Sequence, residues 1–193
     1  MDFEVLERVV RRRRTVKPGR MNGKKIAETD IRDLMQLADW APTHGRTEPW
    51  RFVVLEGEAF KSFSQQHAEL YRGHMPAEKF REDKYDGLRN NYQTASHLII
   101  IVMKRTTDGK IPEDEEYAAV AAAVQNLLLG ASAKEIAAIW STGGMATKPS
   151  MKPLLGLGGE DRVVGFLYLG YADGDNREGS RKIPLSEKVI WKR

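Results

Sequence analysis

The sequence predicts a single globular domain built from both helices and strands. Its 193 residues suit one domain, because domains commonly contain about 100–200 residues. Hydrophobic residues make up 41% of the chain and charged residues 30%, a balance typical of a folded protein and unlike that of a disordered one. Apolar residues recur at helical spacing in some segments and form short continuous runs in others, so both kinds of element are expected.

The charge and the cysteine content narrow the classes of function. The 31 lysines and arginines exceed the 27 acidic residues by four, and the basic run at residues 11–14 accounts for most of this excess. A surplus this small suits an anionic small ligand as well as it suits nucleic acid. The chain has no cysteine, which excludes disulfides, thiolate metal sites and a cysteine nucleophile. The four histidines lack the close spacing of a zinc or iron site, so no metal is expected.

No targeting or membrane segment is visible in the sequence. The N-terminus carries charges throughout in place of the apolar core of a signal peptide. The most apolar stretch, residues 118–133, includes Gln125, Asn126 and Ser132 and is shorter than the roughly 20 apolar residues that a membrane span needs. We therefore expect a cytoplasmic protein with no membrane partner.

The first part of the chain is expected to contain two helices. Apolar residues recur at helical spacing from Phe3 onward, and this helix should end near residues 12–15, before Pro18 breaks the pattern. Asp30 is expected to cap the second helix. Pro42 should end it.

Four more helices are expected further along. Residues 58–91 are charged with scattered aromatic residues, and we expect two helices there, broken near residues 73–76, that cover one face of the protein. Residues 118–133 are apolar nearly all round, so that helix must be buried nearly all round, and a subunit interface is a natural way to bury it. Ser186 is expected to cap a last short helix that contains residues 189–191.

Four strands are expected, at residues 51–55, 98–103, 136–141 and 163–171. The second is almost entirely apolar and should be buried on both faces. The glycines of residues 156–159 do not stand between a strand and a helix, so we interpret them as a turn and not as a dinucleotide-binding fingerprint. No repeat or long linker divides the chain, which predicts one domain over residues 1–193.

The basic run that ends the first helix has three possible roles. Arg13 and Arg14 could be the solvated end of a helix, where cations are favoured. A nucleic-acid patch would be expected to carry interleaved aromatic residues or a second basic stripe, and neither is present. A phosphate carries about −1.5 to −2 charges and suits arginine's fork of donors, and Thr15 adds a hydroxyl beside them. Three later cations are candidates to complete such a site: Arg177, Arg181 and Lys182.

The loop between the second helix and the first strand carries Trp40 and His44. The simplest interpretation is that Pro42 ends the helix and that His44 lies in a polar loop. Alternatively, His44 donates a hydrogen bond to a ligand, because loops between elements often carry binding residues. A Ser-His-Asp triad is not supported, since the chain has no Gly-x-Ser-x-Gly elbow.

The third predicted strand runs into Trp140, Ser141, Thr142 and Gly143. A strand that ends in small residues presents bare backbone N–H and C=O groups, and glycine permits a flat ligand to approach closely. An ordinary turn at the end of a strand would explain the same residues.

Taken in order, these segments resemble the flavin-dependent nitroreductase family, and in particular its short bacterial NAD(P)H nitroreductase branch. The likeness extends over about residues 4–191, and it rests on the order and spacing of the motifs jointly. The motifs are Arg13-Arg14-Thr15-Val16-Lys17, Ala41-Pro42-Thr43-His44, Glu48-Pro49-Trp50-Arg51-Phe52, Trp140-Ser141-Thr142-Gly143 and Val164-Gly165-Phe166-Leu167-Tyr168-Leu169-Gly170-Tyr171.

The resemblance implies an α+β, nitroreductase-like fold in which helices flank a central, mostly antiparallel sheet. It also implies an intertwined homodimer with FMN at the subunit interface. In such proteins the equivalents of Arg13, Arg14 and Thr15 hold the phosphate and the ribityl chain, and we expect Arg181 to help. The acceptor pocket is expected around residues 71–91.

The rest of the implied FMN site surrounds the flavin ring. Trp40 and His44 would reach the flavin of the other subunit. The backbone of Ser141, Thr142 and Gly143 would lie along the ring, and Trp140 is expected to bind the cofactor beside them.

The resemblance implies an FMN-dependent oxidoreductase. Hydride would pass from NADH or NADPH through flavin N5 to an electron-poor acceptor such as a nitroaromatic, in a ping-pong cycle, and no side chain is assigned a catalytic role because the cofactor carries the reaction. Three alternatives stay open: a quinone or enone reductase on the same scaffold, an FMN-binding protein without turnover, and a basic nucleic-acid module. The first two share the cofactor, and we expect no nucleic-acid partner.

The sequence departs from the family pattern at several positions. Thr15 stands where serine is commoner, and it keeps the hydroxyl. Arg46 and Glu48 stand where the wider family has Asn and Gln, so contacts to the pyrimidine edge of the flavin do not transfer. Trp40 stands where some relatives have Arg, and an aromatic residue there would stack or pack and not bind phosphate.

Overall fold

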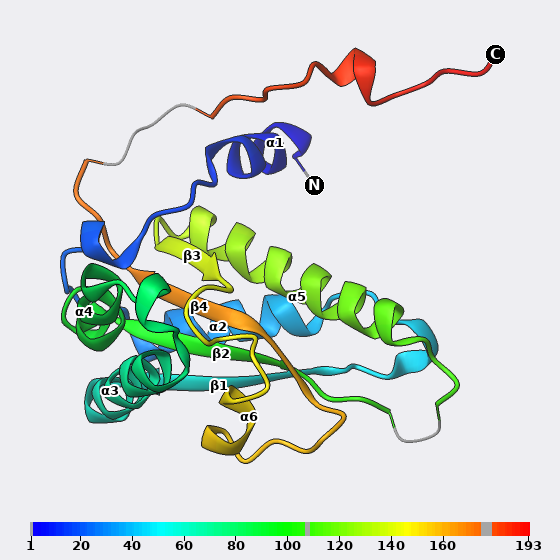
Figure 1. Ribbon diagram of the computed structural model, residues 1–193. Coiled ribbons are helices and arrows are strands. Elements are labelled where there is room, and N and C mark those ends of the chain that lie inside the picture. The colour runs from blue at the N-terminus through cyan, green and yellow to red at the C-terminus, as the bar shows by residue number, and fades with distance from the viewer. Residues whose placement is uncertain (1, 107–108, 175–178) are drawn as a thin grey trace.

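A sheet of four strands forms the centre of the protein. The structure is a computed structural model that describes residues 2–106, 109–174 and 179–193. The strands are β1 (Trp50–Glu56), β2 (His97–Met103), β3 (Ala137–Ser141) and β4 (Arg162–Gly170). They lie in the order β1-β2-β4-β3, and every neighbouring pair is antiparallel. The expected antiparallel sheet flanked by helices is confirmed (Figure 1).

The two central strands are buried because both of their faces are covered. Every residue of β2 is buried, as the run of apolar residues predicts. The register of β4 against β2 shifts between Ile101 and Val102, opposite Gly165 of β4. Gly165 has a φ of +148°, and a Cβ there would lie 2.4 Å from Trp140 Nε1. Only glycine therefore lets the Trp140 ring lie across β4.

One face of the sheet is covered by α2 (Glu28–Asp39) and α5 (Glu113–Ala133). These two helices pack closely, since a Cβ on Gly130 would lie 2.6 Å from a methyl carbon of Leu37. The helix α5 starts five residues before the predicted segment, directly after Pro112. Its first turn carries four acidic residues, which the positive end of the helix dipole favours.

The opposite face is covered by α3 (Gly57–His74), α4 (Glu82–Asn90) and the short α6 (Met151–Leu154). The two predicted helices with a break near Pro76 are confirmed. One stripe of α3, which includes Phe60, Phe63, His67 and Tyr71, is buried. The short helix α6 was not predicted, because four residues are too few to show a helical period.

Two predicted features at helix ends are wrong. Asp30 is not the N-cap of α2, since the helix begins at Glu28 after Ala27. Asp30 instead accepts a hydrogen bond from Lys134 Nζ at 2.7 Å, so its carboxylate serves a tertiary contact. Ser186 does not cap a helix that contains residues 189–191 either, because only a single 3-10 turn, Leu185–Glu187, forms there. The other 3-10 turns are Pro18–Arg20, His44–Arg46, Ala77–Lys79 and Asn91–Gln93.

Both ends of the chain lie away from the sheet. The helix α1 (Phe3–Arg12) contacts α5 but buries none of its residues, and Figure 1 shows residues 179–193 as an extended segment beyond it. Every residue of this terminal segment is exposed, including Ile190 and Trp191. No helix in the described part of the chain combines the length and apolarity needed to cross a membrane.

Candidate functional site

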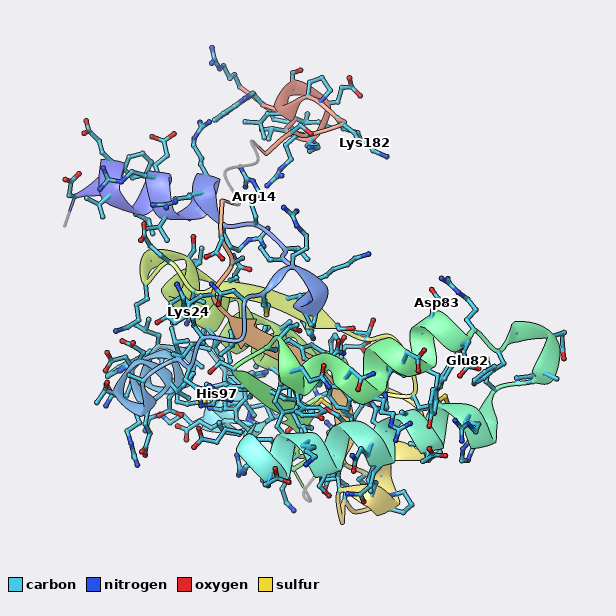
Figure 2. All side chains as sticks on the ribbon, turned by 90° about the vertical axis from the view of Figure 1, so that its left-hand side faces the viewer. Arg14, Lys24, Glu82, Asp83, His97 and Lys182 are labelled. Atoms are coloured by element: carbon cyan, nitrogen blue, oxygen red, sulfur yellow. The ribbon has the colours of Figure 1, made fainter. Side chains whose placement is uncertain are left out.

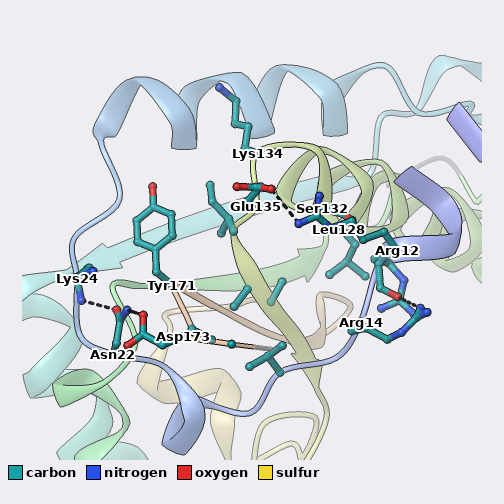
Figure 3. A pocket seen from close by; sticks show the side chains of 17 residues that line it. Arg12, Arg14, Asn22, Lys24, Leu128, Ser132, Lys134, Glu135, Tyr171 and Asp173 are labelled. Carbon is teal, nitrogen blue, oxygen red and sulfur yellow. Dashed lines mark hydrogen bonds and ion pairs between the residues drawn. The ribbon is translucent and has the colours of Figure 1, made fainter. Parts of the chain in front are cut away.

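A cleft of about 550 Å³ opens where the chain leaves α1 and passes the first residues of β3. Its walls come from the end of α1, the C-terminal end of α5, the start of β3 and the chain that leaves β4 (Figure 3). Arg13 and Arg14 both line it, as does Arg12. The basic run of the sequence therefore faces a concave surface.

Backbone contacts to β3 fix the position of this basic run. The helix α1 stops at Arg12, and the Arg13 N–H closes its last turn by donating to the carbonyl of Val9. Two residues later, Thr15 forms a parallel bridge with Ala138, and the Val16 N–H donates to the Ala138 carbonyl at 3.0 Å. The arginines are thus held beside the strand by main-chain bonds.

The charged groups of the cleft differ in their hydrogen-bond and ion-pair partners. Arg12 Nη2 lies 2.8 Å from Glu135 Oε1, and Lys134 bonds two acids of α2. Those two hydrogen bonds raise the pKa of Lys134 above its ordinary value and outweigh the opposing effect of desolvation. Arg14 Nη1 donates to the carbonyl of Arg13 at 2.7 Å, and a Cβ on Gly179 would lie 2.3 Å from Arg14 Nη2. The C-terminal segment therefore lies against this guanidinium.

The expected cations of the C-terminal segment are placed only in part. Arg181 is exposed and donates to the Ser180 carbonyl at 3.2 Å. Figure 2 shows Arg14 below the segment that carries Lys182. Arg177 lies outside the described residues.

The second group of predicted residues lies further along β3, outside the cleft lining. Ser141 is three residues beyond Ala138, which corresponds to about 10 Å of extended strand. Thr142 and Gly143 are exposed, and the Gly143 N–H is 3.4 Å from Ser141 Oγ. Trp140 is half-buried, and its Nε1 donates to the Val164 carbonyl at 3.3 Å. The strand end is exposed as expected, but the backbone of Gly143 is not bare, because its carbonyl also accepts a hydrogen bond from the Ala146 N–H at 3.3 Å.

Trp40 and His44 do not join Arg13 and Arg14 in the cleft. Trp40 is 87% exposed and lines an apolar groove of about 580 Å³ between α1, α2 and α5. His44 Nδ1 lies 2.5 Å from Glu115 Oε2 at the start of α5. In one chain, therefore, the predicted site residues form separate groups.

Some residues of the cleft were missed by the sequence analysis. Asn22 and Asp173 are joined by a hydrogen bond of 2.9 Å, and the Asn22 side chain also accepts from the Lys24 backbone. Figure 3 shows these three side chains together at one end of the cleft. No spacing in the sequence pairs residues 22 and 173, because their contact depends on the chain after η1 (Pro18–Arg20) returning to the end of β4.

A serine–histidine–glutamate chain elsewhere does not form a hydrolytic site. Ser96 Oγ lies 2.9 Å from His97 Nδ1, and His97 Nε2 lies 3.3 Å from Glu56. Ser96 is fully buried and accepts from the Ile26 N–H, so it cannot reach a substrate. Burial lowers the pKa of His97. Among the described residues, no group of three His, Cys, Asp or Glu side chains could hold a metal.

Comparison with known proteins places this geometry in context. A family model described as "Nitroreductase family" matches residues 10–171. The "Putative NAD(P)H nitroreductase YdjA" of Escherichia coli strain K12 is 31% identical over 157 residues, which cover 78% of this chain and 83% of that protein.

Solved structures share the whole fold. The nitroreductase-like family protein from Bacillus cereus aligns with a TM-score of 0.81 at 27% identity, covering 97% of this chain and 95% of that one. The FMN-dependent nitroreductase NfnB from Mycobacterium smegmatis, solved in complex with NADPH, aligns with a TM-score of 0.75 over 99% of each chain. At 18% identity, the second similarity concerns the fold alone.

Proposed function

The chain belongs to the nitroreductase family, and from that premise we propose that it is an FMN-dependent oxidoreductase. It takes electrons from NADH or NADPH and passes them to an electron-poor acceptor such as a nitroaromatic. The whole chain, residues 1–193, acts as one FMN-binding domain. The basic cleft beside β3 is the single observation that carries this proposal.

The cleft has the chemistry that a flavin phosphate requires. A phosphate monoester carries about −1.5 to −2 charges at pH 7. Arg13 and Arg14 line the cleft, and arginine presents a planar fork of donors to phosphate oxygens. One unit-charge pair at about 4 Å is worth up to about 4 kcal/mol at an effective dielectric of 20, before desolvation is subtracted. We assign the phosphate to these two arginines, with the Thr15 hydroxyl beside them and Arg181 as a further cation.

The remaining cofactor contacts follow β3. The strand leads from Ala138 at the cleft to Ser141, and the exposed backbone of Ser141, Thr142 and Gly143 takes the edge of the flavin ring. Trp140 supports this segment by its bond to β4. When bound, FMN supplies the hydride chemistry between the nicotinamide donor and the acceptor. The residues of this chain bind and orient it.

We also propose that the protein is an intertwined homodimer. A single chain leaves α1 without a buried residue and leaves Trp40 exposed in the lining of an apolar groove. Burying such surface against a second copy is favourable by about 25 cal/mol per Å² of apolar area. Trp40 and His44, which do not reach the cleft of their own chain, act at the FMN of the partner subunit.

The visible spectrum of the purified protein tests the cofactor assignment. We expect a yellow protein that NADH or NADPH bleaches under argon and that a nitroaromatic then reoxidises. A colourless protein that does not take up added FMN would contradict the proposal. A yellow protein that neither nucleotide bleaches would instead be an FMN-binding protein without turnover.

Substitution of the two arginines tests the phosphate site. Arg13→Ala/Arg14→Ala should give folded protein that is largely free of flavin. The matched control is Arg32→Ala/Arg89→Ala, which removes the same charge from exposed positions on α2 and α4. A full flavin complement in the first double variant would show that the phosphate binds elsewhere.

A further inference from the structure

The backbone that follows β3 rests on a buried imidazole. His67 of α3 is 1% exposed, and its Nε2 accepts a hydrogen bond from the Met145 N–H at 3.3 Å. A Cβ on Gly144 would lie 2.8 Å from the same nitrogen, and Gly144 has a φ of +66°. The peptide at residues 144–145 therefore lies directly on the His67 ring.

The same ring also contacts β4, the strand that pairs with Ser141 of β3. Its edge packs against Phe166, with ring centroids 5.1 Å apart and an interplanar angle of 85°. Phe166 pairs with Ser141 in the register of β3 and β4. The segment from Ser141 to Met145 is thus fixed by the sheet at one end and by His67 at the other.

His67 makes this contact only in its neutral form. The Met145 N–H needs a lone pair on Nε2, so the single ring proton must be on Nδ1. Burial, and to a lesser degree the positive charge of Lys84, lowers the pKa of His67 to about 4. At neutral pH the ring is therefore uncharged and ready to accept.

We propose that His67 is a positioning residue, which holds the backbone of Ser141, Thr142 and Gly143 in the conformation that receives the flavin ring. This inference rests on the proposed function, because that function places the flavin against this segment. His67 itself touches no substrate or cofactor. It acts through the Met145 N–H and the glycine that precedes it.

Two substitutions of His67 separate this role from simple core packing. His67→Phe keeps an aromatic ring in the core but removes the acceptor. His67→Gln places a carbonyl oxygen near the position of Nε2 and so keeps the acceptor. His74→Phe, on the exposed end of the same helix, is the matched control. Loss of one hydrogen bond corresponds to roughly a tenfold change in an equilibrium constant.

Amide hydrogen exchange in the flavin-free protein measures the contact without the cofactor. We expect the Met145 amide of His67→Phe to exchange about tenfold faster than in the wild type, with His67→Gln and His74→Phe close to the wild type. Titration with FMN, followed by flavin fluorescence and the visible spectrum, should show a dissociation constant about tenfold higher for His67→Phe alone.

A variant on the loop side keeps the test decisive if His67→Phe does not fold. Gly144→Ala leaves His67 intact but forces the peptide off the ring, so it should weaken FMN binding and expose the Met145 amide in the same way. The inference would be overturned if either His67→Phe or Gly144→Ala kept the wild-type exchange rate at Met145 and the wild-type affinity for FMN. It would also be overturned if His67→Gln were as impaired as His67→Phe. Failure of the wild type to bind FMN would refute the proposed function, whereas the exchange rates decide whether His67 holds the segment.

Discussion

Acid should destabilise the protein through His67 in a defined pH window. The ordinary pKa of a histidine is 6.5, and in the folded protein the pKa of His67 is lowered to about 4. Between these two pH values His67 is protonated in the unfolded chain but not in the folded protein, so the free energy of unfolding falls as the pH falls. The stability that depends on neutral His67 is fully present above about pH 6.5 and is lost below about pH 4.

The size of the effect follows from the shift in pKa. A lowering from 6.5 to about 4, at 1.36 kcal/mol per pKa unit, corresponds to about 3 kcal/mol of unfolding free energy. Desolvation of the charged ring is the main cause, because His67 is packed among Phe63, Phe166 and the peptide of Met145. Lys84 of α4 adds a smaller repulsion.

Urea unfolding at a series of pH values measures this term directly. The free energy of unfolding of the wild type and of His67→Phe is compared from pH 7.5 to pH 4, at one protein concentration because association shifts apparent stability. The other ionisable groups are the same in both proteins, so their contributions cancel in the difference. The wild type should lose about 3 kcal/mol relative to the variant over this range. Parallel curves would refute the argument that burial holds His67 neutral.

Two further substitutions test the sheet and the subunit contact. Gly165→Ala should destabilise the protein by about 2–4 kcal/mol and reduce FMN retention, because the new Cβ would lie 2.4 Å from Trp140 Nε1. The control is Gly159→Ala, where a Cβ meets nothing within 4 Å. Equal melting temperatures for the two variants would contradict this account. Trp40→Glu should shift the protein from dimer to monomer in light scattering, because it puts a charge in the apolar groove, and an unchanged mass would show that the groove is not the interface.

Much of the fold could be predicted because its signals are local. The apolar run of β2 and the helical period of α1 depend only on neighbours in the sequence, and both elements form close to where they were expected. Asp30 shows the limit of such signals. An aspartate near a helix start is typical of an N-cap, but this one bonds Lys134 from across the chain. The terminal segment shows it too, since residues 189–191 are exposed and so lack the packing that stabilises a short helix.

The candidate site could be predicted only as separate pieces, for a related physical reason. Arg13 and Arg14 were recognisable by their charge, and the glycines after β3 by their backbone freedom. His67 left a weaker signal. It repeats the helical phase of Phe63 and Tyr71, which marks it as buried, yet nothing local shows that its acceptor faces the peptide of Met145. That contact exists because the fold brings α3 against the segment after β3, 78 residues away along the chain. The hydrogen bond between the site's backbone and the core therefore marks a positioning residue that the local sequence does not. The same contact accounts for the one buried imidazole on a helix otherwise rich in surface charge.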